Sequence, residues 1–149
     1  MKNTILLLIA LVLAGLLHAQ DQLSKTQQTV QQTIISMFDA LSNRDSISLK
    51  TFCTADIALF EYGQLWNIDT LILKAITLNQ ATDFKRSNSF DFINTNADKN
   101  TAWVAYHLNS VITREGKQAT AQWLETVVLV KERKQWKIRH LHSTLIKRS

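Results

Sequence analysis

The 149-residue sequence contains no proline, one cysteine and three glycines, and only Gly63 and Gly116 lie beyond the first twenty residues. So few chain-breaking residues argue against flexible linkers, low-complexity segments and solenoid repeats. A single cysteine, Cys53, excludes an intramolecular disulfide and is expected to be a small, buried apolar residue. Cysteine and histidine do not recur at zinc-ligand spacing, so we predict no metal site and no cofactor.

The charge balance is modestly basic, with 17 Lys and Arg against 12 Asp and Glu, which gives a net charge of +5. Much of the positive charge lies within residues 131–148. A nucleic-acid surface would interleave aromatic residues on the same exposed face or carry a known module, and neither is visible. We therefore expect no nucleic-acid partner, and we interpret the basic segment as a solvated edge that discourages pairing with other chains.

The N-terminus has the pattern of an export signal. A positive Met1–Asn3 region precedes an apolar run from Ile5 to Leu17, and Ala19 supplies a small residue at the cleavage position. The alternative, an uncleaved membrane anchor, is disfavoured because the run is shorter than the roughly 20 residues that span a bilayer. We expect a periplasmic or secreted protein with one domain, residues 20–149, and no stable membrane anchor after cleavage.

The first half of this domain has helical periodicity. Apolar residues recur at spacings of three and four within residues 23–42. Asp45 or Ser46 can cap a short second helix, and Asp69 with Thr70 can cap a third helical stretch over residues 71–78. Residues 56–63 between the last two are β-prone and end at a glycine turn.

The second half is rich in β-branched and aromatic residues. Four strands are predicted over residues 84–93, 101–113, 119–131 and 135–146, separated by polar turns. Helices followed by long antiparallel hairpins indicate an α+β domain. We expect a strongly bent antiparallel sheet that wraps the N-terminal helices and leaves a cone between them.

The last strand carries the strongest functional signal. Strict alternation puts His140 and His142 on the same face as Trp136 and Ile138, as expected for a cavity wall or an interface. Glu125 lies in an apolar strand, where a carboxylate must be paired, neutral or facing a cavity. We predict that Glu125 contacts His142, or else His140, as a structural ion pair or a proton-handling dyad.

Three further residues are candidates for the pocket. Tyr106 could donate its hydroxyl to a ligand, or be an ordinary strand aromatic. Glu61, which follows Leu59 and Phe60, and Trp66, whose ring could form an apolar wall, are the other two candidates. The four tryptophans as a group are expected to divide between the cavity wall and an interface.

The sequence resembles the nuclear-transport-factor-2-like superfamily in several segments. They are residues 60–63 with Trp66, and residues 102–106, 123–126 and 136–143. The match is to its SnoaL-like branch, which includes the association domain of calcium/calmodulin-dependent kinase. The resemblance covers nearly the whole domain and implies the cone-shaped fold. It does not imply one function, because this fold hosts isomerases, cyclases, dehydratases and assembly modules.

The sequence departs from the enzymes of that superfamily. Leu108 stands where the association domain of the kinase has a pocket arginine, and the paired acid–base carboxylates of ketosteroid isomerase have no obvious counterparts. We therefore expect an exported, non-catalytic domain that binds a small, largely apolar ligand or mediates assembly. The alternative is a cofactor-free isomerase, cyclase or dehydratase. Apolar residues on both faces of the predicted strands also favour a homodimer that pairs through the outer face.

Overall fold

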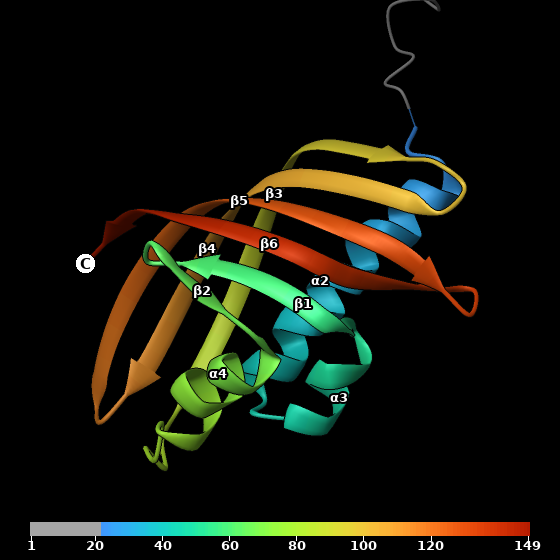
Figure 1. Cartoon of the computed structure of the whole chain (residues 1–149). Helices are drawn as coiled ribbons and strands as arrows, with labels where there is room; N and C mark the ends of the chain where they lie inside the picture. The colour runs from blue at the N-terminus through green and yellow to red at the C-terminus, as the bar shows by residue number, and fades with distance from the viewer. Residues whose placement is uncertain (1–21) are drawn as a thin grey trace, which may run out of the picture.

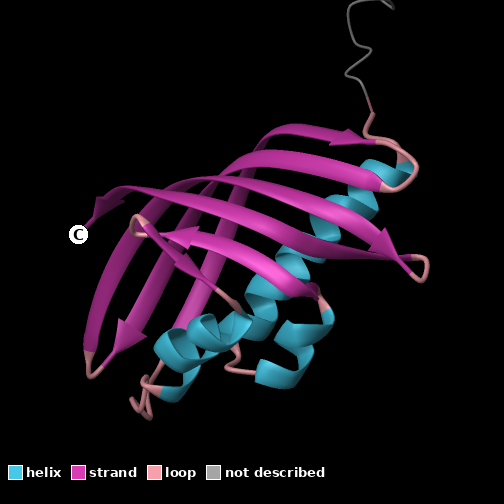
Figure 2. Cartoon of the chain, viewed as in Figure 1, coloured by secondary structure: helices cyan, strands magenta, loops and turns pink. Residues whose placement is uncertain are grey.

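The computed structural model describes residues 22–149, so the predicted cleavage near Ala19 lies outside the described residues. Two helices come first in the chain, two strands and a third helical stretch follow, and four long strands complete a curved, unclosed six-stranded sheet, which confirms the expected α+β class (Figure 1). The helices lie on the inner side of the curved sheet (Figure 2). Within the described residues, no helix is long and apolar enough to cross a membrane.

The first helix, α2 (Lys25–Ser42), begins at a capping box. The Ser24 hydroxyl accepts from the Gln27 backbone N–H, and the Gln27 side chain accepts from the Ser24 N–H. This pairing satisfies two of the N–H groups that a helix start leaves without partners. The buried stripe of α2, which includes Val30, Ile34 and Phe38, is the face that the sequence periodicity predicts.

Two short helical elements follow. Helix α3 (Ser46–Thr51) is capped by Asp45, as predicted. The third helical stretch is α4 (Ile68–Ile72), which continues as a π-helical turn, η1 (Leu73–Thr77). Its cap is Asn67 rather than the expected Asp69, because the Asn67 side chain accepts from the Thr70 N–H at 2.9 Å.

The six strands form one sheet in the order β2-β1-β6-β5-β4-β3. All neighbours pair antiparallel except β1 and β6, which pair parallel, so an early strand lies beside the last one. The strands are β1 (Cys53–Glu61), β2 (Gln64–Trp66), β3 (Lys85–Ala97), β4 (Thr101–Arg114), β5 (Lys117–Glu132) and β6 (Gln135–Arg148).

The core lies between α2 and the inner face of the sheet. Ile34 and Leu49 from the helices are fully buried, as are Leu108, Leu129 and Ile138 from the strands. Cys53 is buried at the start of β1, as expected from its apolar character, and burial raises the pKa of its thiol to about 12. With Cys53 free, non-covalent interactions hold the described residues together.

The pairing of β5 with its two neighbours differs. Strand β4 follows β5 in register from Thr101 opposite Val130 to Arg114 opposite Lys117. Strand β6 shifts register against β5 twice. At the first shift along β6, Leu129 lies opposite Ile138 while Val128 lies opposite His140. Arg139 is therefore an extra residue, a β-bulge, and side chains after it change face.

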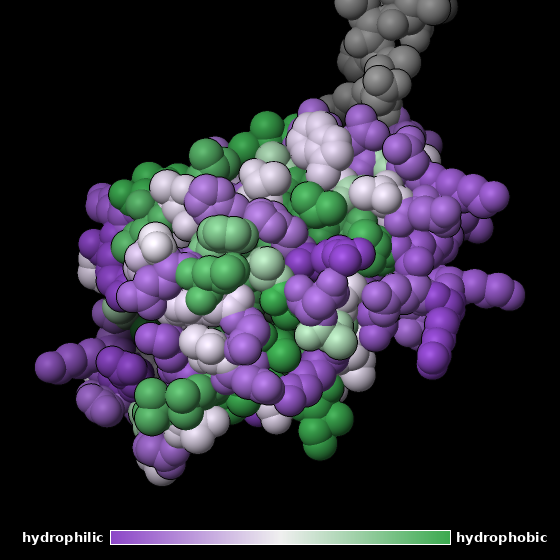
Figure 3. All heavy atoms as spheres, in the orientation of Figure 1, coloured by the Kyte–Doolittle hydropathy of each residue, from purple (hydrophilic) through white to green (hydrophobic). Residues whose placement is uncertain are grey.

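The outer face of the sheet is mixed in polarity. Figure 3 shows apolar patches among polar side chains over the strands, whereas the turn between β5 and β6 is strongly hydrophilic. The large apolar residues of the outer face are between 38% and 41% exposed, and they are Phe60, Trp103, Val111 and Leu124.

Candidate functional site

Three adjacent strands place Tyr106, Glu125 and Ser143 in one row on the inner face. Tyr106 lies opposite Glu125, and Glu125 lies opposite Ser143. The Tyr106 hydroxyl donates to Glu125 Oε2 at 2.6 Å, and the Ser143 hydroxyl donates to Oε1 at 2.7 Å. Both oxygens of the buried carboxyl group are thus satisfied without an imidazole.

The predicted contact between Glu125 and His142 is wrong, and the Arg139 bulge is the reason. Before the bulge, Trp136 and Ile138 face inward as predicted. After it, Leu141 and Ser143 are buried, while His142 is exposed on the outer face. One inserted residue exchanges the two faces of a strand, so strict alternation assigned the wrong face to both histidines.

His140 and His142 instead pack around Phe60 of β1. The ring centroids lie 5.0 Å from Phe60 for His140 and 6.0 Å for His142. His140 is half-buried in this cluster and His142 is exposed. Neither histidine lines the main cavity.

Tyr106 lies beneath the site and does not line its wall. It is fully buried, and Phe90 and Phe92 of β3 each lie 5.6 Å from its ring. Burial, with the nearby charge of Glu125, raises the pKa of Tyr106 well above its ordinary value. Its hydroxyl holds Glu125, so the predicted donation to a ligand does not fit this geometry.

A cavity of about 340 Å³ opens above this row, between the sheet and the helical segments. Glu61, Glu125 and Ser143 line it from β1, β5 and β6. Trp66 lies in its wall as predicted, and the Lys74 ammonium lies 4.8 Å from the Trp66 ring centroid. The apolar lining is half aromatic and half aliphatic and consists of Phe38, Leu41, Trp66, Leu71, Ala75, Phe84, Ile112 and Trp123.

Glu61 and Glu125 bring two carboxyl groups into this cavity. Burial, together with the nearby charge of Glu125, raises the pKa of Glu61 to about 7, although Ser143 and the charge of Arg86 oppose the shift. Burial also raises the pKa of Glu125, and this outweighs its two hydroxyl donors and Arg86, which favour the ionised form. Near neutral pH the site can therefore hold or release a proton at Glu61.

Arg86 of β3 is a site residue that the sequence reasoning missed. Its Nε donates to Asn88 Oδ1 at 2.9 Å and to Ser110 Oγ at 3.3 Å, and its Nη2 donates to Ser110 Oγ at 3.1 Å. Desolvation lowers the pKa of its guanidinium, and the two glutamates oppose that shift. The signal was available, because Phe84, Arg86, Asn88 and Phe90 alternate with exposed residues and so share the inner face.

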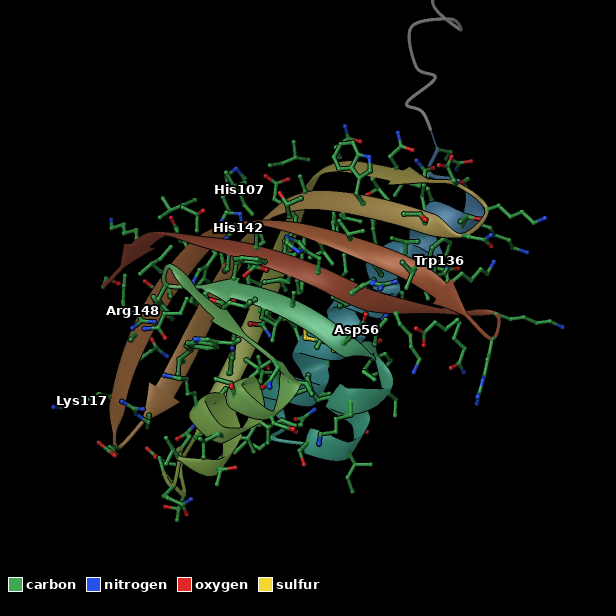
Figure 4. The ribbon with its side chains drawn as sticks, viewed as in Figure 1. Asp56, His107, Lys117, Trp136, His142 and Arg148 are labelled. Atoms are coloured by element: carbon green, nitrogen blue, oxygen red, sulfur yellow. The ribbon has the colours of Figure 1, made fainter. Side chains whose placement is uncertain are left out.

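A second, smaller cavity of about 250 Å³ lies beside the first, where β1 and β6 separate. Their pairing ends at Phe60 opposite His142, although β6 continues along β5 as far as Arg148. Glu61 and Ser143 line both cavities, and His142 lines only this one. The Arg148 side chain, beside the β1–β2 turn in Figure 4, donates to the Tyr62 hydroxyl at 3.0 Å.

The described residues contain no group of three His, Cys, Asp or Glu side chains that could hold a metal ion. One buried polar atom of the main cavity has no hydrogen-bond partner, Oδ1 of Asn79.

Comparison with known proteins places this geometry in a family context. The model of the SnoaL-like domain matches residues 30–146. No curated protein matches the chain.

Solved structures share the fold at low sequence identity. The CaMKII hub homology domain of Chlamydomonas reinhardtii has a TM-score of 0.73 at 19% identity, over 83% of this chain and 100% of that one. An NTF2-like protein from Cytophaga hutchinsonii has a TM-score of 0.69 at 14% identity, with coverage of 83% and 100%. A ketosteroid isomerase-like protein from Erwinia carotovora atroseptica has a TM-score of 0.67 at 14% identity, with coverage of 84% and 99%.

Proposed function

The chain belongs to the SnoaL-like family, and on that premise we propose that it binds a small, largely apolar molecule in its main cavity. One observation carries the proposal: aromatic and aliphatic side chains line a cavity of about 340 Å³, and polar groups that include Glu61, Glu125 and Arg86 share that lining. Ligand sites in proteins commonly have this composition and volume. The walls would bury an apolar body while the polar groups fix its orientation.

Native mass spectrometry of the purified protein, before and after exposure to cell extract, tests this role. We expect a retained or captured small molecule that disappears in Ala75→Trp, because Ala75 lines the cavity and an indole there would fill it. Ala55→Trp is the matched control, since Ala55 is exposed on β1. Capture that is absent from the wild type, or unchanged in Ala75→Trp, contradicts the proposal.

A second candidate is a cofactor-free enzyme that moves a proton at carbon, and Glu61 favours it. A carboxyl group with a pKa of about 7 in an apolar pocket is suited to general acid–base catalysis. A solved neighbour is named ketosteroid isomerase-like, which supports this chemistry by analogy alone. The captured molecule, incubated in D₂O, would gain carbon-bound deuterium with the wild type but not with Glu61→Gln. Equal deuterium uptake with both proteins excludes Glu61 as the base.

Assembly is a third role, and the outer face of the sheet favours a homodimer. Phe60, Trp103, Val111 and Leu124 leave apolar area there, and several solved neighbours are named hub or association domains. Sedimentation at micromolar concentration should give the mass of two chains, and Leu124→Asp should give one. Ile47→Asp, on the exposed side of α3, is the control and should stay dimeric. A wild-type mass of one chain excludes the dimer.

Export to the periplasm or medium also remains a proposal, supported by the apolar run from Ile5 to Leu17 and by Ala19. The intact mass of the protein recovered from those compartments should correspond to a chain that starts near Gln20. Recovery of the uncut chain in the membrane fraction contradicts it.

A further inference from the structure

The charges around the main cavity point to the chemical class of its ligand. We propose that the cavity binds a small organic acid as its anion, with the carboxylate on Arg86 and a proton taken up from solvent by Glu61. This inference rests on the ligand-binding role proposed above and adds the charge of the ligand and its coupling to a proton.

Arg86 is a positioned cation without a carboxylate partner. Its hydrogen bonds go to two neutral acceptors, the amide oxygen of Asn88 and the hydroxyl of Ser110. Nη1 makes no hydrogen bond to any described residue, and Arg86 forms no ion pair within 4.0 Å in that part of the chain. A guanidinium prefers planar anions that accept two parallel hydrogen bonds, so a carboxylate fits the open side of this group.

The surroundings hold the guanidinium in place for such a contact. The Arg86 carbon Cζ lies 5.5 Å from the ring centroid of Phe38 and 5.7 Å from that of Trp123, and both rings line the cavity. The same rings can cover the apolar body of an acid whose charged end meets Arg86. A ligand with one flat apolar part and one carboxylate would therefore satisfy both parts of the cavity.

The remaining charges of the cavity favour an anion. Two acidic side chains line it, and four basic ones do, so positive charge is in excess even with both acids ionised. Clefts lined by one sign of charge attract ligands of the opposite sign. The basic residues that line the cavity are Lys74, Arg86, Arg114 and Arg148.

Proton uptake follows from the crowding of carboxyl groups. Glu61 and Glu125 line the same cavity, where burial and then the charge of Glu125 raise the pKa of Glu61, and a bound carboxylate adds a third acidic group. Glu61 would take a proton from solvent, and the cavity would keep its total charge. The titratable and charged groups around Glu61 come from the β1–β2 turn, η1, β3, β4, β5 and β6, and they are Tyr62, Lys74, Arg86, Tyr106, Arg114, Glu125, His142 and Arg148.

Calorimetric titration with three matched probes tests the inference: 3-phenylpropionate, its neutral amide and 3-phenylpropylamine. We expect the carboxylate to bind about tenfold more tightly than the amide at pH 6, because the amide cannot form the charged pair. Its affinity should fall about tenfold between pH 6 and pH 8. Repeating the titration in buffers of different ionisation enthalpy should show net proton uptake on binding.

Variants separate the two parts of the inference. Arg86→Gln should abolish the preference for the carboxylate over the amide, whereas Arg133→Gln, on the exposed β5–β6 turn, should preserve it. Arg86→Lys keeps the positive charge but cannot donate two parallel hydrogen bonds from one planar group. It replaces Arg86→Gln in this test if that variant fails to fold, and it should weaken the preference for the carboxylate. Glu61→Gln should keep carboxylate binding and lose both its pH dependence and the proton uptake.

Four results overturn the inference: equal affinity for acid and amide, tightest binding of the amine, binding of none of the probes, or pH-independent binding by the wild type. Equal affinity or amine preference would leave the ligand-binding role standing, because the cavity would still bind the apolar body. That role fails only if capture from cell extract is also negative.

Discussion

Strand β5 has a neighbour on each side, and the two neighbours follow it differently. Along β4 the register holds over the whole strand, so alternation places Tyr106 and Glu125 on the inner face as expected. Along β6 the bulge at Arg139 exchanges the faces, and Ser143 takes the inward position assigned to His142. Alternation is therefore a reliable guide to the inner face only as far as the first bulge.

The turn that joins β4 to β5 and the turn that joins β5 to β6 also differ, because only the first has a glycine at a positive φ. The β4–β5 turn uses Glu115 and Gly116 at φ of 54° and 70°. The β5–β6 turn uses Arg133 and Lys134 at 48° and 70°, a left-handed conformation that costs energy without glycine. The turn between β5 and β6 therefore carries backbone strain at its second residue, Lys134. The turn between β4 and β5 avoids that strain because its second residue is Gly116.

The largest expected effect comes from removing the bulge itself. Deleting Arg139 would turn Leu141 and Ser143 to solvent and carry His140 and His142 into the core, or shift β6 by one residue along β5. Either outcome exposes apolar residues or buries unpaired polar ones, so we expect a loss of more than about 4 kcal/mol in unfolding free energy. Denaturant unfolding followed by circular dichroism measures this loss.

The control substitutes the same residue without changing the length of the strand. Arg139→Ala removes an exposed ion pair with Asp56 at 2.8 Å and should cost about 0.5 kcal/mol or less. A deletion variant as stable as Arg139→Ala would show that β6 does not need the bulge to place Ser143 inside.

The next largest effect comes from Glu125→Ala. The hydroxyls of Tyr106 and Ser143 would lose their acceptor, and we expect a loss of about 2–4 kcal/mol. In double-mutant cycles, Tyr106→Phe should be coupled to Glu125→Ala. The double variant should lose less free energy of unfolding than the sum of the losses in the two single variants. His142→Ala should add to Glu125→Ala within about 0.5 kcal/mol, because the two side chains lie on opposite faces. Coupling to His142 without coupling to Tyr106 would reverse this assignment.

A smaller effect is expected from the pH dependence of Glu61. Its pKa of about 7 in the folded state exceeds the ordinary value of 4.5, so the folded protein holds a proton that the unfolded chain releases between these values. The stability that this proton contributes is fully present below pH 4.5 and is lost as the pH rises through 7. Allowing for solvent screening at a half-buried group, we expect a loss of about 1–3 kcal/mol.

Glu61→Gln is neutral at every pH and should flatten this decline, leaving the contribution of Glu125. Urea unfolding at pH 5 and pH 8 compares the two proteins. An identical decline in wild type and variant would place the titrating group elsewhere.

The smallest effect concerns the two turns. Lys134→Gly should stabilise the protein by about 0.5–1 kcal/mol, because glycine adopts a φ of 70° without steric cost. Gly116→Ala is the reciprocal change and should destabilise by about 1 kcal/mol. A Cβ there would meet no atom within 4 Å, so the effect is confined to the backbone. Thermal unfolding midpoints measure both changes, and equal midpoints in all three proteins would rule out turn strain.

Much of the fold could be predicted from the sequence, whereas the site could be predicted only in part. Periodicity and polar turns located α2 and the four long strands, because those signals are local. The presence of Glu125, Glu61 and Trp66 in the cavity followed from residue type and position. The hydrogen-bond partners of Glu125 could not be predicted in the same way. Arg139 looks like any exposed strand residue, and nothing in the neighbouring sequence marks it as a bulge. Arg86 was missed because its immediate neighbours in the chain are polar, although it shares the alternation of Phe84 and Phe90.

The parallel pairing of β1 with β6 has a consequence for the order of folding. Strand β1 follows the helices early in the chain, yet its sheet neighbour toward the core is the last strand, and the Ile138 N–H donates to Phe52 O at 2.8 Å where they first meet. Contacts between such distant segments close a large loop and form slowly. Because a ribosome releases the chain from its N-terminus, β1 has only β2 to pair with until β6 has been synthesised. The domain therefore cannot finish folding while its last strand is still in the exit tunnel.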